Sequence, residues 1–176
     1  MNIANKLTML RILLVPVFVI ALMLVGTDTV IPLLLFSIAA ATDALDGYFA
    51  RSRNLITTFG KFLDPIADKL LVISAFVMFV EMGLVPGWAA LIIISRELII
   101  TGFRVIAASN NVTIAASVFG KIKTITQFAA IILMLLPMKG LETVAQVLLY
   151  LSVIATALSG VDYVIKNKEV LDLDNI

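Results

Sequence analysis

Long apolar runs alternate with short polar stretches along the whole chain. The apolar runs fall at about residues 12–26, 30–50, 62–82, 88–108, 118–137 and 143–165. Each run is close to the ~20 apolar residues that an α-helix needs to cross the hydrocarbon core of a bilayer. Turn-forming residues such as Gly26, Asn110 and Gly140 stand between the runs. The pattern predicts an all-α integral membrane protein with six transmembrane helices.

The composition argues against a water-soluble fold. Of 176 residues, 61% are hydrophobic and 14% are charged, and the mean hydropathy is +1.11. A chain of this length cannot hide so much apolar surface from water, so we expect membrane lipids around it. The runs leave only short loops and tails, which predicts one transmembrane domain over residues 1–176. The net charge of only +1 gives no reason to expect a nucleic-acid partner.

Basic residues are distributed unevenly between the two ends of the predicted helices. One set of ends carries Lys6, Arg11, Arg51, Arg53, Lys61, Lys121, Lys123, Lys166 and Lys168. The opposite ends carry essentially Lys139 alone. Because lysine and arginine are enriched in cytoplasmic loops, we expect both termini in the cytoplasm. No small-x-small cleavage site follows the first run, which we interpret as a retained helix of a multi-pass cell-membrane protein.

The chain contains no cysteine and no histidine. The absence of cysteine excludes disulfides, thiolate catalysis and iron–sulfur clusters. The absence of histidine removes the usual acid–base catalyst and the commonest zinc ligand. Any catalysis must therefore use carboxylates, lysine or arginine, hydroxyls, backbone groups or a bound metal.

Four aspartates stand at the inner ends of the second and third predicted helices, where ionisable groups are costly and usually functional. Asp43 and Asp46 are three residues apart, and Asp64 and Asp68 are four apart, so each pair shares one helix face. A short loop joins the two helices, which places both pairs at a similar depth. Carboxylates this close repel unless a cation lies between them. The set predicts a site for Mg²⁺, Mn²⁺ or Ca²⁺, with room for two ions about 3.5–4 Å apart.

Two other interpretations of these acids stay open at this point. The aspartates could form structural ion pairs with Arg51, Arg53, Lys61 and Lys69. They could also belong to an ion or proton transporter, although such sites lie near the bilayer midplane, often within inverted repeats. This sequence instead places its acids at one interface and shows no internal repeat.

The spacing of these residues resembles the signature of the CDP-alcohol phosphatidyltransferases. The pattern is Asp43-x2-Asp46-Gly47-x2-Ala50-Arg51-x8-Gly60-x3-Asp64-x3-Asp68, and every signature position is filled. The resemblance implies that an alcohol hydroxyl displaces CMP from a CDP-linked lipid. It also implies two metal ions, Mg²⁺ or Mn²⁺, held by the aspartates, with Asp68 also the general base. Residues of the CDP site would be Asp46, Gly47, Ala50, Arg51 and Gly60.

A second set of charges lies within the fourth and fifth runs. It comprises the bases Arg96, Arg104, Lys121 and Lys123 and the single acid Glu97. An excess of bases here predicts an anionic acceptor. Lys121 and Lys123 are two residues apart and cannot both point the same way, so one is expected to snorkel. The alternative is that Arg96 pairs with Glu97 or a signature aspartate, and that the lysines only follow the positive-inside rule.

Further segments resemble the phosphatidylglycerophosphate synthase branch of this family. They are Asn5-Lys6-Leu7-Thr8-x2-Arg11-Ile12-x3-Pro16, Ser95-Arg96-Glu97-Leu98, Gly102-x-Arg104 and Gly120-Lys121-x-Lys123-Thr124-x2-Gln127. The resemblance implies transfer of a phosphatidyl group from CDP-diacylglycerol to sn-glycerol 3-phosphate at the cytoplasmic face. Bases among Arg96, Arg104, Lys121 and Lys123 would bind the acceptor phosphate, and Glu97 would orient an arginine.

The same resemblance places Asn5 and Thr8 near the nucleotide and suggests a homodimer. Other acceptors remain open for the same chemistry, namely phosphatidylglycerol, as in a cardiolipin synthase, or inositol phosphate. A stimulation of CMP release by glycerol 3-phosphate distinguishes the leading hypothesis from these, and ion flux without CMP release would favour the transporter.

Overall fold

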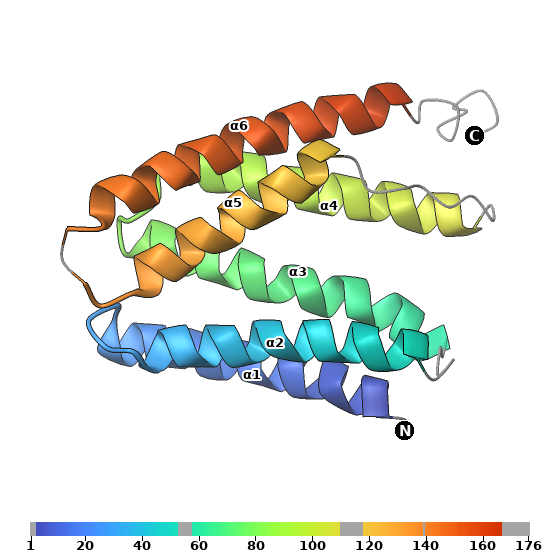
Figure 1. Ribbon diagram of the computed structural model, residues 1–176, viewed down its shortest axis with the longest axis horizontal. Coiled ribbons are helices and arrows are strands. Elements are labelled where there is room, and N and C mark those ends of the chain that lie inside the picture. Colours follow the sequence, from blue (N-terminus) through green and yellow to red (C-terminus); the bar gives the residue numbers. More distant parts are fainter. Residues whose placement is uncertain (1–2, 53–57, 110–117, 139, 167–176) are drawn as a thin grey trace. The chain divides into compact units, whose positions relative to one another are not determined.

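We describe a computed structural model of the chain. The structure describes residues 3–52, 58–109, 118–138 and 140–166, and within them the side chains of residues 6–42, 66–67, 69–107, 118–138 and 140–166. These residues form six helices and no strand (Figure 1). The helices are α1 (Ile3–Val25), α2 (Ile31–Ser52), α3 (Thr58–Glu81), α4 (Gly87–Ser109), α5 (Val118–Leu135) and α6 (Glu142–Lys166). The predicted all-α class is confirmed.

Most predicted boundaries agree with the observed helices to within a few residues, but α1 begins at Ile3 rather than near residue 12. The apolar run marks only the part of a helix suited to hydrocarbon. The preceding segment contains Ala4, Lys6 and Leu7, which are good helix formers, so the helix extends beyond the apolar run. This extension places Asn5 and Thr8 on a helix.

Glycine ends two of the helices in the way their positions predict. Gly26 follows α1 with φ of +59°, and its N–H donates to the carbonyl of Leu22 at 2.9 Å. Gly83 follows α3 with φ of +72°, and the next N–H, of Leu84, reaches back to Phe79 at 2.8 Å. The left-handed backbone lets these residues satisfy carbonyls at the helix ends, which a residue with a side chain does less readily.

Helices α1, α2 and α3 form one compact unit, which also includes residues 134–140. Each of the three helices contacts the other two. The rings of Phe18 and Phe36 are fully buried where α1 meets α2, with centroids 5.7 Å apart. The three helices alternate in direction, so the start of α1, the end of α2 and the start of α3 lie at the same end of this unit (Figure 1).

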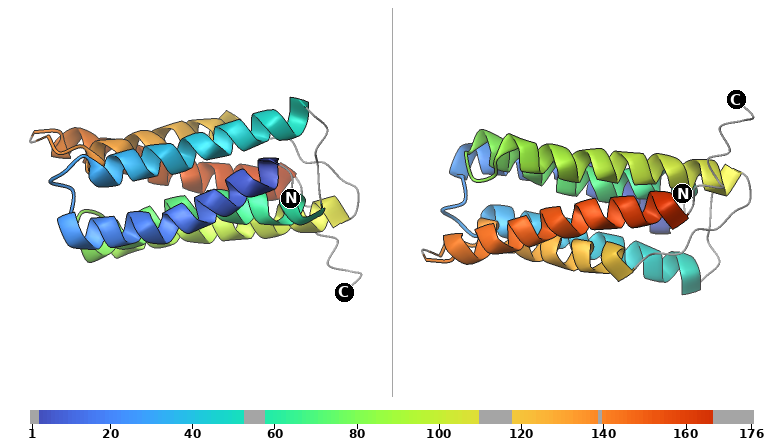
Figure 2. Two further views of the ribbon diagram at one scale, coloured as in Figure 1. Left: turned by 90° about the horizontal axis from the view of Figure 1, so that it is seen from below. Right: turned by 90° about the horizontal axis from the view of Figure 1, so that it is seen from above.

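Helices α4 and α6, with most of α5, form the second unit. Helix α4 packs along α6 (Figures 1 and 2). At one end of this contact Trp88 stacks on Tyr150, with ring centroids 6.1 Å apart. Towards the other end Phe103 meets Tyr163 edge-on at 6.3 Å. Ala89 on α4 and Ala145 on α6 are small and buried, as is common where membrane helices pack together.

Three helical segments are long and apolar enough to cross a membrane, counting only the residues that the structure describes. They are Lys6–Val25, Val118–Leu135 and Glu142–Lys166, while Ile31–Thr42 is a shorter apolar segment. Helix α4 carries three charged residues, Arg96, Glu97 and Arg104, within its apolar run. Large apolar side chains such as Leu13 and Leu24 are exposed, as expected for a protein surrounded by lipid. The chain is therefore a helical membrane protein.

Candidate active site

The four signature aspartates lie on two helices of the first unit. Asp43 and Asp46 occupy the second half of α2, and Asp64 and Asp68 occupy the first half of α3. The two helices contact each other, and a short connection joins the ends that carry the aspartates. The backbone thus places both pairs at one end of the unit. The aspartate side chains lie outside the described residues, so the prediction of metal ligation stays a prediction.

The donor chemistry of this set fits a divalent cation. The helices provide two pairs of carboxylates at three- and four-residue spacing, which puts each pair on one face. Carboxylate oxygens are the ligands that Mg²⁺ and Mn²⁺ prefer. Four acids gathered at the end of two contacting helices also require positive charge to coexist ionised.

The other signature positions lie on the same helices. Gly47, Ala50 and Arg51 follow Asp46 on the last turns of α2, and Gly60 lies on the first turn of α3. Their side-chain positions, like that of Asn5 on α1, lie outside the described residues. Their predicted contacts with CDP are therefore untested.

A buried arginine on α1 is the feature of this end that the sequence pattern did not reveal. Arg11 is 0% exposed, and its Nε donates to the Thr42 hydroxyl at 3.4 Å. Thr42 in turn donates to the carbonyl of Ala39 at 2.6 Å and directly precedes Asp43. Thr8 lies one turn before Arg11 and is also buried. The sequence presented Arg11 as a basic flank, yet it joins α1 to the part of α2 where the signature begins.

The signal that could have revealed this arginine is its spacing. Thr8 and Arg11 are three residues apart, so they share a helix face, and the apolar run begins at the next residue, Ile12. A charge at the edge of an apolar run can either snorkel or bind a polar partner inside the bundle. Only the packing of α1 against α2 decides between these outcomes.

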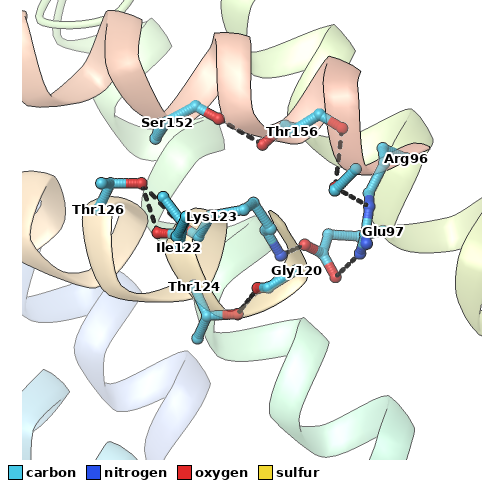
Figure 3. A network of polar contacts seen from close by, with 10 residues as sticks. Arg96, Glu97, Gly120, Ile122, Lys123, Thr124, Thr126, Ser152 and Thr156 are labelled. Atoms are coloured by element: carbon cyan, nitrogen blue, oxygen red, sulfur yellow. Dashed lines mark hydrogen bonds and ion pairs between the residues drawn. The ribbon is translucent and has the colours of Figure 1, made fainter. Parts of the chain in front are cut away.

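In the second unit, Glu97 on α4 lies between two bases (Figure 3). Its side chain is 2% exposed, and one oxygen pairs with the ammonium of Lys123 on α5. The other oxygen lies 4.0 Å from Nη1 of Arg96. Lys123 is itself buried, whereas Lys121 is exposed. The expectation that the two lysines point in different directions is confirmed. The proximity of Glu97 to Arg96 fits both the predicted orienting role and the alternative of a structural Arg96–Glu97 pair.

Arg96 also contacts α6. Its Nε donates to the hydroxyl of Ser159 at 3.1 Å. Ser159 donates to the carbonyl of Thr156 at 3.0 Å, and Thr156 donates to the carbonyl of Ser152 at 2.6 Å (Figure 3). All three α6 hydroxyls are buried. Their four- and three-residue spacing puts them on one stripe of the helix.

The remaining predicted acceptor residue is Arg104. It lies about two turns beyond Arg96 on α4 and is exposed. Its guanidinium carbon is 5.9 Å from the ring centroid of Tyr163, within the range of a cation–π contact. The four predicted acceptor bases therefore divide into two groups. Arg96 and Lys123 gather at Glu97, while Arg104 and Lys121 present their charges at exposed positions.

Comparison with known proteins agrees with these features. The CDP-alcohol phosphatidyltransferase family model matches residues 1–158. A Bacillus subtilis CDP-diacylglycerol–glycerol-3-phosphate 3-phosphatidyltransferase is 42% identical, with 99% of both chains covered. A Mycobacterium tuberculosis protein named as a probable phosphatidylglycerophosphate synthase is 41% identical over 93% of this chain and 80% of its own length.

A third relative, from Haemophilus influenzae, bears the same name as the Bacillus protein. It is 41% identical over 99% of this chain and 97% of its own length. Identity at this level, extending across the signature and both charged helices, shows common descent and a common fold. The chain belongs to the CDP-alcohol phosphatidyltransferase family.

Proposed function

We propose that this protein transfers the phosphatidyl group of CDP-diacylglycerol to sn-glycerol 3-phosphate, giving phosphatidylglycerol phosphate and CMP. The observation that carries this proposal is the 42% identity to a relative named for that reaction, over 99% of both chains. The complete aspartate signature supports the donor half of the reaction, and the basic residues of α4 and α5 support an anionic acceptor.

We infer that Asp43, Asp46, Asp64 and Asp68 hold two divalent cations, Mg²⁺ or Mn²⁺. When bound, such ions supply charge neutralisation for the diphosphate and for the departing CMP. The carboxylate spacing on the contacting helices α2 and α3 supports this assignment. Arg51, at the end of α2, adds a fixed positive charge suited to a phosphate oxygen.

An alcohol is a weak nucleophile, so the reaction needs a base at hydrogen-bond distance. The chain has no histidine, and Asp68 takes this role in the proposal. The acceptor oxygen forms a bond to the phosphorus that carries diacylglycerol, and its proton passes to an oxygen of Asp68. The bond from that phosphorus to the CMP oxygen breaks, and CMP leaves as its anion.

The rest of the CDP site is proposed at the same end of the first unit. Gly47, Ala50 and Gly60 allow the nucleotide to approach the helix backbones, because they add little or no side chain. Asn5 and Thr8 on α1 complete the proposed site. The burial of Thr8, one turn from the Arg11–Thr42 contact, supports its place inside this helix end.

The acceptor phosphate is proposed to bind among Arg96, Arg104, Lys121 and Lys123. Glu97 can balance only one of the two bases that it faces, so Arg96 and Lys123 together retain a net positive charge. A dianionic phosphate complements such a group, and arginine is well suited to bind it bidentately. Neutral acceptors would gain nothing from this charge.

We further propose six membrane spans with both termini and the active site on the cytoplasmic side of the cell membrane, and a homodimer. The basic residues at one set of helix ends support this orientation. An exposed apolar row on α6, including Leu151, Leu158 and Val161, offers a surface for lipid or a second copy.

The test is CMP release by the purified full-length protein in mixed micelles with CDP-diacylglycerol and Mn²⁺ or Mg²⁺. We expect glycerol 3-phosphate to stimulate release, and a chelator to abolish it. Phosphatidylglycerol and inositol phosphate serve as competing acceptors. If either of these stimulates release and glycerol 3-phosphate does not, the proposed acceptor is wrong. Ion flux in liposomes without CMP release would contradict the transferase as a whole.

The proposed role of Asp68 as general base is tested by a separate variant. We expect Asp68→Asn to reduce CMP release by at least about 100-fold, the usual contribution of a general base. The matched control is Asp28→Asn, which changes an exposed aspartate between α1 and α2. Undiminished turnover of Asp68→Asn would remove this residue from the mechanism.

A further inference from the structure

Two neighbouring residues of α6, Ser159 and Gly160, contact the side chain of Arg96. The hydroxyl of Ser159 accepts a hydrogen bond from Nε of Arg96 at 3.1 Å. At Gly160, an added Cβ would lie 3.4 Å from Cγ of Arg96, so the arginine stem passes directly over the glycine. One residue binds the guanidinium and the next makes room for the stem that carries it.

The hydroxyl of Ser159 has little freedom to rotate. It is fully buried and donates its own hydrogen to the carbonyl of Thr156 at 3.0 Å. Its lone pairs are therefore left to accept from Nε of Arg96. Because a guanidinium is planar and its donors are fixed in a fork, a bond at Nε sets the plane of the whole group.

Glu97 provides a second contact for the guanidinium of Arg96. Nη1 of Arg96 lies 4.0 Å from a Glu97 oxygen, and Glu97 is itself paired with Lys123. Contacts at Nε and Nη1 leave the remaining N–H groups of the fork for a ligand. The side chain of Arg96 keeps 13% exposure, in contrast to 2% for Glu97, so the group is held but accessible.

We propose that Ser159 and Gly160 are positioning residues, which hold the guanidinium of Arg96 in the orientation that binds the phosphate of the acceptor. The proposal rests on the proposed function, because it takes Arg96 as a phosphate ligand. Neither residue belongs to the aspartate signature, and both lie beyond residues 1–158, which the family model matches. Because they hold this long cationic side chain in place before the acceptor binds, less conformational entropy is lost on binding.

The main test is Ser159→Ala in the CMP-release assay, with glycerol 3-phosphate and CDP-diacylglycerol varied separately. We expect the KM for glycerol 3-phosphate to rise about tenfold, as for the loss of one hydrogen bond to a charged group. The kcat and the KM for CDP-diacylglycerol should stay within about twofold of the original protein. Ser159→Thr keeps the hydroxyl and should restore most of the KM.

Ser152→Ala is the matched control. Ser152 is also fully buried on α6 and donates to a carbonyl three residues earlier, that of Leu149, at 2.7 Å. Its loss should change the thermal stability as much as Ser159→Ala does, without the tenfold rise in KM. If both serine variants change KM equally, or if Ser159→Ala lowers kcat and raises both KM values together, the positioning role is refuted.

Two substitutions of Gly160, by a small and by a large side chain, provide an independent test. Gly160→Ala adds a Cβ at ordinary contact distance from Arg96, 3.4 Å, and should change the KM for glycerol 3-phosphate by less than about threefold. Gly160→Leu fills the space that the arginine stem occupies and should raise it at least tenfold. Inorganic phosphate, used as a competitive inhibitor, should lose affinity in parallel.

These outcomes separate the two proposals. If glycerol 3-phosphate does not stimulate CMP release by the unmodified protein, the proposed function fails. A different outcome is that glycerol 3-phosphate stimulates release while Ser159→Ala and Gly160→Leu leave its KM and the inhibition by phosphate unchanged. In that case the proposed function stands, and the positioning role of Ser159 and Gly160 is refuted.

Discussion

Glu97 shows how a single residue in this bundle balances charges from more than one helix. It is buried at 2% exposure between Lys123 of α5 and Arg96 of its own helix. Taking one buried charge away from its partner is far more costly than replacing the pair by apolar groups. The sequence predicted that Glu97 would orient an arginine. It could not show which lysine would join, because that depends on the rotation of α5 about its axis.

We therefore expect Glu97→Gln to lower the free energy of unfolding by about 3–5 kcal/mol, because the ammonium of Lys123 loses its buried counter-charge. The measurement is thermal or denaturant unfolding in a defined detergent. The control is Lys166→Gln, which breaks the pair between the exposed Lys166 and the half-buried Asp162 at 2.7 Å and should cost less than about 1 kcal/mol. The double variant Glu97→Met/Lys123→Met should recover most of the loss. If it is as unstable as Glu97→Gln, the charge argument is wrong.

At the scale of helices, the contact between α1 and α2 connects an otherwise apolar interface to the start of the aspartate signature. Phe18 and Phe36 pack in its interior, and the Arg11–Thr42 hydrogen bond lies further towards the end that carries Asp43. The existence of both helices followed from their apolar runs. The polar link between them did not, because Arg11 and Thr42 are 31 residues apart and nothing local in the chain couples them.

Thr42→Val tests this link with almost no change of shape. Removing the hydroxyl takes away one acceptor of Arg11, and we expect a loss of about 1 kcal/mol in the free energy of unfolding. Because Thr42 directly precedes Asp43, the concentration of Mn²⁺ that gives half-maximal CMP release should also rise. Thr42→Ser keeps the hydroxyl and should behave like the unmodified protein. If Thr42→Ser is destabilised and Thr42→Val is not, the methyl group matters rather than the hydrogen bond.

At the scale of the whole molecule, the sequence predicts its helices well and its polar contacts poorly, for one physical reason. Helices are local, and their apolar runs record the thickness of the bilayer. The contact of Arg96 with Ser159 spans 63 residues and depends on how α4 packs along α6. Ser152, Thr156 and Ser159 are four and three residues apart and share one stripe of α6, but nothing in this spacing identifies the group that faces them.

The orientation in the membrane is the prediction that concerns the whole chain, and the absence of cysteine makes it simple to test. Single cysteines can be introduced without removing any native one. Asp28→Cys lies between α1 and α2, whereas Lys6→Cys and Lys166→Cys lie near the start of α1 and at the end of α6. If basic residues mark the cytoplasmic side, Asp28→Cys should react with a membrane-impermeant maleimide in intact cells. The other two should react only after permeabilisation. Labelling of Lys6→Cys and Lys166→Cys from opposite sides would mean an odd number of spans, and labelling of both from outside would invert the proposed orientation of the active site.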